Sequence, residues 1–306
     1  MHREEWDAVY LNQDRILRSL KELDSDMFLA GGTGLHRFVL HRPYRHSEDL
    51  DFFFPVLLEN EDVATVVKQA TDLIGAIPGA RIDEIRRIKE ERAFRLWCRF
   101  EDNDEIVKVE FLNFTCDRFG ERTYLTDGVP FRTENLYNLL LYKLKALCDR
   151  PDTIKDLFDL YFIFRDLPAL SITKIMQDLN AKFEDAIGIR YEKRNIIQAL
   201  EHDLKWDIEI GEIKHLYDLQ SEINAFQTQL KWEILNEEIV DFSYQKRIEQ
   251  RAKVFDLDTS SYLELVDVLE ENNFWIDEVK RKMVEAWGIE QSLFLGCFDG
   301  RRKSYP

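Results

Sequence analysis

The sequence predicts an α+β fold, in which a small domain with a mixed sheet, residues 1–128, precedes a mainly helical domain, residues 129–306. The first domain holds short apolar runs that end at turn residues, which is typical of strands. From Thr133 onward the apolar residues recur every three or four positions, which is the spacing of amphipathic helices. The length of 306 residues agrees with two domains of roughly 100–200 residues each.

In the first domain, short apolar runs at 27–30 and 50–54 predict two strands. Residues 59–74 have helical spacing. Residues 92–100 alternate between two faces, with Phe94, Leu96, Cys98 and Phe100 on one and Arg95, Trp97 and Arg99 on the other, and residues 106–114 resume as a strand after an acidic turn. We therefore expect an antiparallel hairpin from the last two segments.

In the second domain, the first helix is marked by an apolar stripe and ends before Pro151. Residues 153–164 predict a second helix. Charged amphipathic helices are expected from there to about residue 287, for example at 213–235 and 262–271. The residues of the first stripe are Leu136, Leu139, Leu140, Leu144 and Leu147.

The composition excludes several classes of protein. With 42 basic and 59 acidic residues the net charge is -17, so bulk charge cannot attract a nucleic acid and any such contact needs a local basic patch. No apolar run approaches the roughly 18 residues of a membrane helix, and the charged N-terminus has no signal-peptide pattern. The four cysteines form no C-x-x-C motif, which argues against zinc and disulfides. We expect a cytoplasmic enzyme that binds no membrane.

A glycine turn follows the first predicted strand, and a helix is expected to start near Thr33. Gly31 and Gly32 would let the backbone approach a ligand closely. The N–H groups of a helix start attract anions, and Thr33 adds a hydroxyl, so a phosphate site is one interpretation. The other is an ordinary tight turn with Thr33 as the N-cap.

Three acidic residues are candidate metal ligands. Asp49 and Asp51 alternate onto one face of a strand, where a divalent cation such as Mg²⁺ would relieve their repulsion. The alternative is a solvated acidic start of the strand. Glu110 interrupts a second apolar strand, which is costly without a partner. It is either a ligand or part of an exposed face that it shares with Lys108.

Three charged residues in the helical part complete the candidate site. Lys143 lies within the apolar stripe, where it either binds an anion such as phosphate or extends its ammonium group to water. Asp156 has capping-box spacing from Thr153. Asp159 follows one turn later, and it could accept a proton or hold Lys143.

The densest run of positive charge could bind a nucleic-acid backbone. Interleaved acids, among them Asp83 and Glu84, favour a solvated, salt-bridged surface instead. The sequence has no Walker A motif, no G-x-G-x-x-G and no H-E-x-x-H, which disfavours dehydrogenases and metal hydrolases. The basic residues are Arg81, Arg86, Arg87, Lys89, Arg92, Arg95 and Arg99.

Taken together, residues 30–35, 41–42 and 47–53 resemble the signature of the AbiEii/AbiGii-type nucleotidyltransferase toxin family. Residues 143–161 resemble that family's second conserved region. The resemblance spans about residues 25–165. It implies a nucleotidyltransferase-like fold of the polymerase-β type, and often the toxin of an abortive-infection toxin–antitoxin pair.

The resemblance also implies roles for residues of this sequence. The implied metal ligands are Asp49, Asp51 and Glu110, the last being less typical because related enzymes usually have Asp. The implied nucleotide- and phosphate-binding residues are Gly31, Gly32, Thr33, Lys143 and Asp156. The implied catalytic residues are Asp49, Asp51, Lys143 and Asp159.

The implied reaction is transfer of a nucleoside monophosphate from an NTP to an acceptor hydroxyl, with release of pyrophosphate. The 3′ end of tRNA is the leading acceptor, the cofactor is Mg²⁺ or Mn²⁺, and an antitoxin protein is an implied partner. Two metal ions about 3.5–4 Å apart would stabilise the attacking and leaving oxygens. The alternatives are an inactive protein that binds a nucleotide or a partner, and a kinase-like phosphoryl transferase that leaves ADP or GDP.

Overall fold

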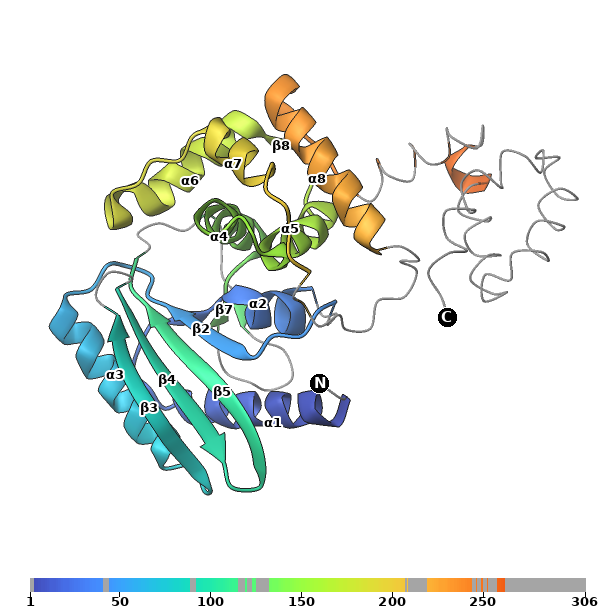
Figure 1. Ribbon diagram of the computed structural model, residues 1–306. Helices are drawn as coiled ribbons and strands as arrows, with labels where there is room; N and C mark the ends of the chain where they lie inside the picture. The colour runs from blue at the N-terminus through green and yellow to red at the C-terminus, as the bar shows by residue number, and fades with distance from the viewer. Residues whose placement is uncertain are drawn as a thin grey trace, which may run out of the picture.

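The computed structural model describes residues 3–40, 44–88, 92–114, 119, 123–124, 132–206, 208, 219–243, 246, 249, 252 and 258–261. A seven-stranded mixed sheet in this part of the chain has the order β3-β4-β5-β2-β1-β7-β6, and a group of helices packs beside it (Figure 1). The strands are β1 (Phe28–Leu29), β2 (Asp49–Phe53), β3 (Ala80–Ile88), β4 (Ala93–Phe100), β5 (Asn103–Leu112), β6 (Thr123–Tyr124) and β7 (Arg132–Thr133).

One face of the sheet is apolar and is covered by α1 (Arg3–Leu20) and α3 (Asn60–Gly75). Alternation along the strands aims Leu50, Phe52 and Val109 at these helices, and all three are fully buried. Polar residues of the same strands therefore point to the opposite face.

Two registers place the polar residues. β2 and β5 run parallel, with Asp49 opposite Lys108 and Asp51 opposite Glu110. β5 and β4 are antiparallel, with Glu110 opposite Arg95. Residues that lie opposite one another in a ladder share a face, so acids of β2 and β5 lie beside a cation of β4.

The helical part begins with α4 (Leu136–Asp149) and α5 (Ile154–Asp166). The side chain of Asn135 caps α4, and that of Thr153 caps α5. Then follow α6 (Ile172–Ile187), α7 (Lys193–Ala199) and α8 (Leu219–Asn236). The two-residue strands β8 (Leu170–Ser171), before α6, and β9 (Ile239–Val240), after α8, pair with each other.

The larger apolar cluster joins the sheet to α4 and α5. Phe53 of β2 packs against Tyr142 of α4, with 4.5 Å between the ring centroids. A short helical turn, α2 (Gly31–Thr33), continues as the π-helical segment η1 (Gly34–Val39) and lies between β2 and α4 (Figure 1). The connection from β1 to β2 is thereby held against the helical part.

The α+β class is confirmed, and so are the predicted strands at 27–30 and 50–54, the hairpin and the helices at 59–74 and 153–164. Among the longer elements, α1, whose sequence is mostly charged and polar, and β3, which lies within the basic run, escaped prediction, and so did the two-residue strands β6, β7, β8 and β9. The predicted helix 262–271 lies outside the described residues, and 213–235 is described from Leu219 onward. The division at residue 128 stays a prediction.

None of the helices described here has the length and apolarity that crossing a membrane requires.

Candidate active site

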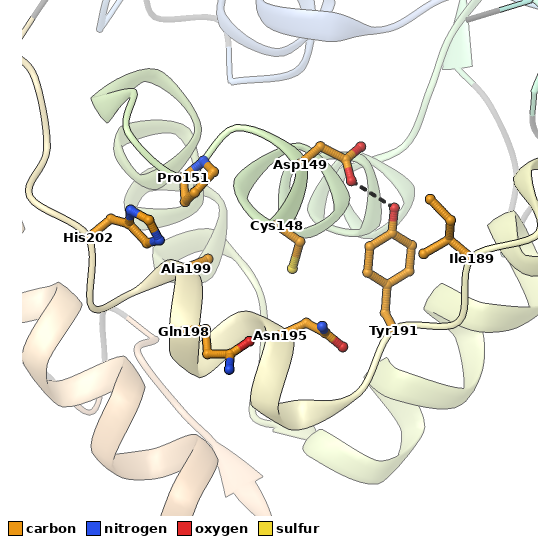
Figure 2. Close-up of a pocket in the computed structure, with 9 residues that line it drawn as sticks. All are labelled: Cys148, Asp149, Pro151, Ile189, Tyr191, Asn195, Gln198, Ala199 and His202. Carbon is orange, nitrogen blue, oxygen red and sulfur yellow. Dashed lines mark hydrogen bonds between the residues drawn. The ribbon is translucent and has the colours of Figure 1, made fainter. Parts of the chain in front are cut away.

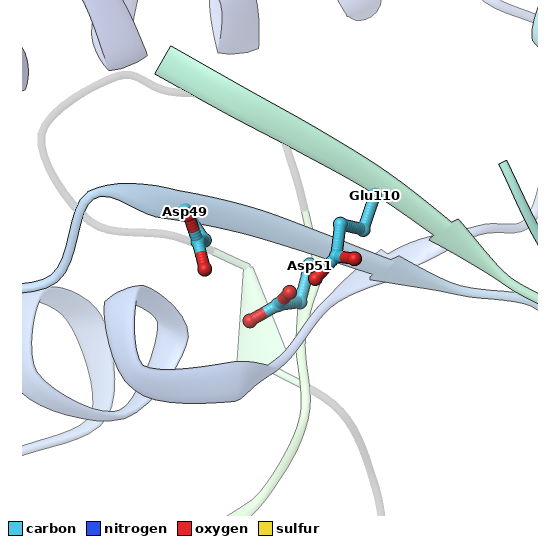
Figure 3. A group of neighbouring side chains, drawn as sticks. All are labelled: Asp49, Asp51 and Glu110. Carbon is cyan, nitrogen blue, oxygen red and sulfur yellow. The ribbon is translucent and has the colours of Figure 1, made fainter. Parts of the chain in front are cut away.

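Three carboxylates gather where β2 and β5 run side by side (Figure 3). Asp49 and Asp51 come from β2, and Glu110 comes from β5. One ligand oxygen from each can be chosen so that all lie within 4.8 Å of one another. The common face of Asp49 and Asp51 was predicted from the strand alternation. The close approach of Glu110 required the parallel register of two strands far apart in sequence.

The cations near the three carboxylates balance their negative charge only in part. Burial, followed by the negative charges of Asp49 and Glu110, raises the pKa of Asp51 to about 7. Burial alone would raise the pKa of Glu110 too, but Lys108 and Arg95 outweigh it and lower that pKa. Lys108 Nζ lies 2.8 Å from Asp49 Oδ2 and 3.2 Å from Glu110 Oε2. Three close carboxylate oxygens can bind a hard divalent cation such as Mg²⁺. The negative charge of Asp51 in particular has too little positive charge beside it.

Gly31 can be only glycine for two reasons. Its φ is +63°, which L side chains rarely adopt. A Cβ at this position would lie 1.8 Å from Asp51 Oδ2. The backbone of the turn therefore touches the carboxylate directly, and any ligand of Asp51 also lies next to the turn.

Gly32 brings the same turn against Arg45. A Cβ there would lie 2.7 Å from Arg45 Nη2 and 2.7 Å from Ser47 Oγ. Thr33 is fully buried, and its hydroxyl donates to the carbonyl oxygen of Asp49 at 2.5 Å. The side chain of Thr33 makes no capping bond, so the N-cap interpretation was wrong. Thr33 instead holds the turn to β2.

A buried charged cluster lies behind the turn, on α4 and α5. Lys143 Nζ lies 2.6 Å from Asp159 Oδ2 and 3.2 Å from Asp156 Oδ1, and its side chain is only 6% exposed. Extension of this ammonium group into water is therefore excluded. Both acids are fully buried, so Lys143 neutralises charge that would otherwise be costly.

Asp159 is the centre of this cluster. Arg45 donates to it twice, from Nε at 2.6 Å and from Nη2 at 2.7 Å, and His36 Nε2 donates at 2.8 Å. Burial opposes ionisation, but Arg45 and Lys143 more than offset it, so the pKa of Asp159 lies well below its usual value. An ionised acid with these donors holds Lys143 and Arg45 rather than accepting a proton.

Asp156 pairs with the most accessible cation of the cluster. Arg150 donates from Nε to Asp156 Oδ2 at 2.7 Å and from Nη2 to Oδ1 at 3.0 Å, while its side chain remains 56% exposed. The capping-box account of Asp156 is therefore wrong, because its carboxylate faces Lys143 and Arg150. Arg45, Lys143 and Arg150 together face two carboxylates, which leaves an excess of positive charge behind the glycine turn.

The comparison with protein families shows the family to which the chain belongs. Residues 15–232 match the family model described as nucleotidyl transferase AbiEii toxin, type IV TA system. The chain belongs to the AbiEii nucleotidyltransferase toxin family. It is therefore a nucleotidyltransferase of a toxin–antitoxin family, and the predicted nucleotidyltransferase-like fold is confirmed by this match and by the mixed sheet.

Two solved structures are similar to this chain. The crystal structure of JHP933 from Helicobacter pylori is 19% identical, with a TM-score of 0.46 over 77% of this chain and 95% of that one. A second H. pylori crystal structure, described as a candidate nucleotidyltransferase, is also 19% identical, with a TM-score of 0.44 over 77% of this chain and 98% of that one. No curated protein matches the chain significantly.

The residues that sequence reasoning missed in this AbiEii-family chain are mostly cations. Arg45 and His36 gave no sequence signal, because their partner Asp159 is more than one hundred positions away. Arg95 was grouped with the basic run, yet it binds Glu110. Arg150 lies within residues 143–161, which contributed to the family resemblance, but no role was predicted for it. Residues 41–42, which contributed to the resemblance, lie outside the described residues.

A separate cavity of about 260 Å³ lies at the end of α4, next to α7 (Figure 2). Cys148, Tyr191 and His202 are among its lining residues, and the Tyr191 hydroxyl donates to Asp149 at 3.0 Å. None of the site residues expected of an AbiEii-family nucleotidyltransferase lines it. The carboxylates, not this cavity, define the candidate active site.

Proposed function

We propose that this chain transfers a nucleoside monophosphate from an NTP to an acceptor hydroxyl at the 3′ end of tRNA, releasing pyrophosphate. The observation that carries the proposal is the contact between the glycine turn and Asp51, with Asp49 and Glu110 beside it. A turn that can approach phosphates thus lies against three carboxylates that can hold a divalent cation. The AbiEii family match supports the reaction class.

Asp49, Asp51 and Glu110 would hold Mg²⁺ or Mn²⁺. When bound, the cation would stabilise negative charge on the reacting phosphate oxygens. Lys108 now balances two of these acids, so cation binding would have to displace it. Asp51 would lose its proton on binding, because its pKa is raised to about 7.

The other predicted residues form two groups: those that would contact the substrate, and those that would hold neighbouring side chains in place. Gly31 and Gly32 would bring the backbone to the triphosphate. Arg150 would bind a phosphate of the NTP, because its side chain is 56% exposed and the charge of Asp51 acts on it as well as that of Asp156. Lys143, Asp156 and Asp159 are buried, so we assign them to holding Arg45 and Arg150 in place.

The test is a labelled-transfer assay with each α-³²P-NTP, Mg²⁺ and total tRNA. We expect label on RNA with the wild type and none with the Asp49→Ala/Asp51→Ala variant. The matched control is Glu61→Ala/Asp62→Ala, which removes two exposed acids at the start of α3 and should retain transfer. Undiminished labelling by Asp49→Ala/Asp51→Ala would contradict the proposed site.

The position of the label separates the alternatives. Transfer from γ-³²P-NTP but not from α-³²P-NTP would indicate a kinase-like phosphoryl transferase. Nucleotide binding by calorimetry without any transfer would favour an inactive binding protein. The type IV toxin–antitoxin description supports an antitoxin as partner, and we propose that the chain acts in the cytoplasm.

A further inference from the structure

We propose that the open face of β3, β4 and β5 binds the sugar-phosphate backbone of a single-stranded RNA and leads its 3′ end to the carboxylates. This inference rests on the proposed function and adds the surface that receives the acceptor. We call this surface the acceptor strip. Its residues are Arg81, Arg86, Arg95, Trp97, Arg99 and Lys108.

The strand registers place the strip directly beside the carboxylates. Asp51 lies opposite Glu110, Glu110 opposite Arg95, and Arg95 opposite Arg86, so one row crosses four strands. Neighbouring strands are about 4.8 Å apart, so the two guanidinium groups follow the acids at steps of one strand. A mononucleotide at the carboxylates would leave such a row unused, whereas a polynucleotide could follow it.

The next row adds an aromatic platform. Asp49 lies opposite Lys108, and Lys108 lies opposite Trp97. The guanidinium of Arg86 lies over the Trp97 ring, 5.3 Å from its centroid. Cations beside an aromatic ring are the elements with which proteins hold single-stranded nucleic acids, by phosphate contacts and base stacking.

The strip is accessible at the β3 edge. The side chains of Arg86 and Arg81 are 61% and 78% exposed. α1 and α3 cover the other face of the sheet, and β3 to β5 extend away from the helical part (Figure 1). Because the whole chain carries a net charge of -17, a local row of cations is the kind of place where RNA can approach.

The acids of the strip do not block this use. Glu84 pairs with Arg86, and Asp83 pairs with Arg81 and Arg99, as the interleaved acids predicted. Exposed ion pairs of this kind contribute little, so a phosphate can compete for their cations. Arg95 and Lys108 bind Glu110, and Lys108 also binds Asp49, so a divalent cation held by these acids would weaken the contacts and let both side chains bind phosphate.

The test is fluorescence anisotropy with a labelled 12-nucleotide single-stranded RNA and Mg²⁺, using Arg86→Glu. We expect at least about a tenfold loss of affinity. The matched control is Arg87→Glu, because Arg87 is the next residue of β3, pairs with Phe94 and lies on the other face. It should remain within about twofold of wild type. Equal affinity of the two variants would overturn the proposal.

Two further measurements identify the contacts. Arg86→Ala should lower the slope of log affinity against log salt by about 0.7, the value for one phosphate of a single strand. Trp97→Leu should weaken binding several-fold, while Trp97→Phe should restore most of it. Tighter binding of single-stranded DNA or of blunt duplex RNA than of this RNA would contradict the assignment to single-stranded RNA.

NTP binding by calorimetry separates this inference from the proposed function. Arg86→Glu should bind NTP like the wild type, because Arg86 lies two strands beyond Glu110. RNA binding that depends on Arg86 in a protein that transfers no label would leave the strip standing without the reaction. Transfer to RNA with an unchanged KM for RNA in Arg86→Glu would preserve the reaction and overturn the strip.

Discussion

Gly31 is the residue at which the turn and the carboxylates meet. Its positive φ and its contact with Asp51 are two separate demands for glycine. Gly188 has the first demand only, because its φ is +70° and a Cβ there would meet nothing within 4 Å. Comparing a substitution at Gly31 with one at Gly188 therefore distinguishes the effect of backbone strain from the effect of displacing Asp51.

We expect Gly31→Ala to destabilise the protein more than Gly188→Ala. The left-handed conformation alone costs an L residue roughly 1–2 kcal/mol, and Gly31→Ala also displaces the Asp51 carboxylate. Urea unfolding measures the stability, and Mn²⁺ titration measures the metal affinity, which only Gly31→Ala should reduce. Equal metal affinity in both variants would contradict the contact.

Asp51 predicts a pH dependence of the metal-free protein. Its pKa is raised from 3.8 to about 7, so between these pH values the folded protein keeps a proton on Asp51 that the unfolded chain releases. The resulting stabilisation is complete below pH 3.8 and is lost as the pH rises to about 7. Without metal, Asp51→Asn should therefore raise Tm more at pH 8 than at pH 5.

Thermal melts in EDTA at the two pH values test this prediction. Asp72→Asn is the control, because that exposed acid forms an exposed ion pair with Lys68 of the same helix. The same change of Tm at pH 5 and pH 8 in Asp51→Asn would argue against a raised pKa.

At the scale of elements, Asp159 fixes α5 to the connection between β1 and β2. Its carboxylate accepts bonds from His36 and Arg45 of that connection, and it also pairs with Lys143 of α4. We expect Asp159→Ala to cost about 3–5 kcal/mol, because it leaves buried cations uncompensated.

Chemical denaturation measures this cost, with Asp152→Ala as the control. Asp152 pairs with Lys205 at an exposed position, where the loss of stability should be much smaller than in Asp159→Ala. A small loss in Asp159→Ala would mean that Arg45 and Lys143 find other partners, and it would weaken our assignment of these residues to positioning.

At the scale of the whole molecule, the candidate active site forms where the sheet meets the helical part. β2 and β5 supply the acids, the turn after β1 supplies the backbone, and α4 and α5 supply the buried cluster. The apolar cluster that includes Phe53 and Tyr142 holds these parts together. The acceptor strip then extends from the site along the same face of the sheet.

Many of the predicted elements and site residues came from patterns within single segments of the sequence. Alternation placed Asp49 and Asp51 on one face, and helical spacing placed Lys143, Asp156 and Asp159 on the helices that carry them. β3 was missed because its residues, largely exposed, lack the alternating apolar pattern of a half-buried strand. α1 was missed because its polar residues outnumber its apolar ones.

From its local patterns alone, the sequence predicted the glycine turn and the acids of the candidate site, because strand and helix periods act over a few neighbouring positions. Which side chains come into contact became known from the three-dimensional arrangement. Glu110 reaches Asp51 through a parallel register, Arg45 reaches Asp159 across the fold, and Arg86 joins the row of the carboxylates through two antiparallel pairings. Such contacts depend on packing between distant segments, which no local pattern records.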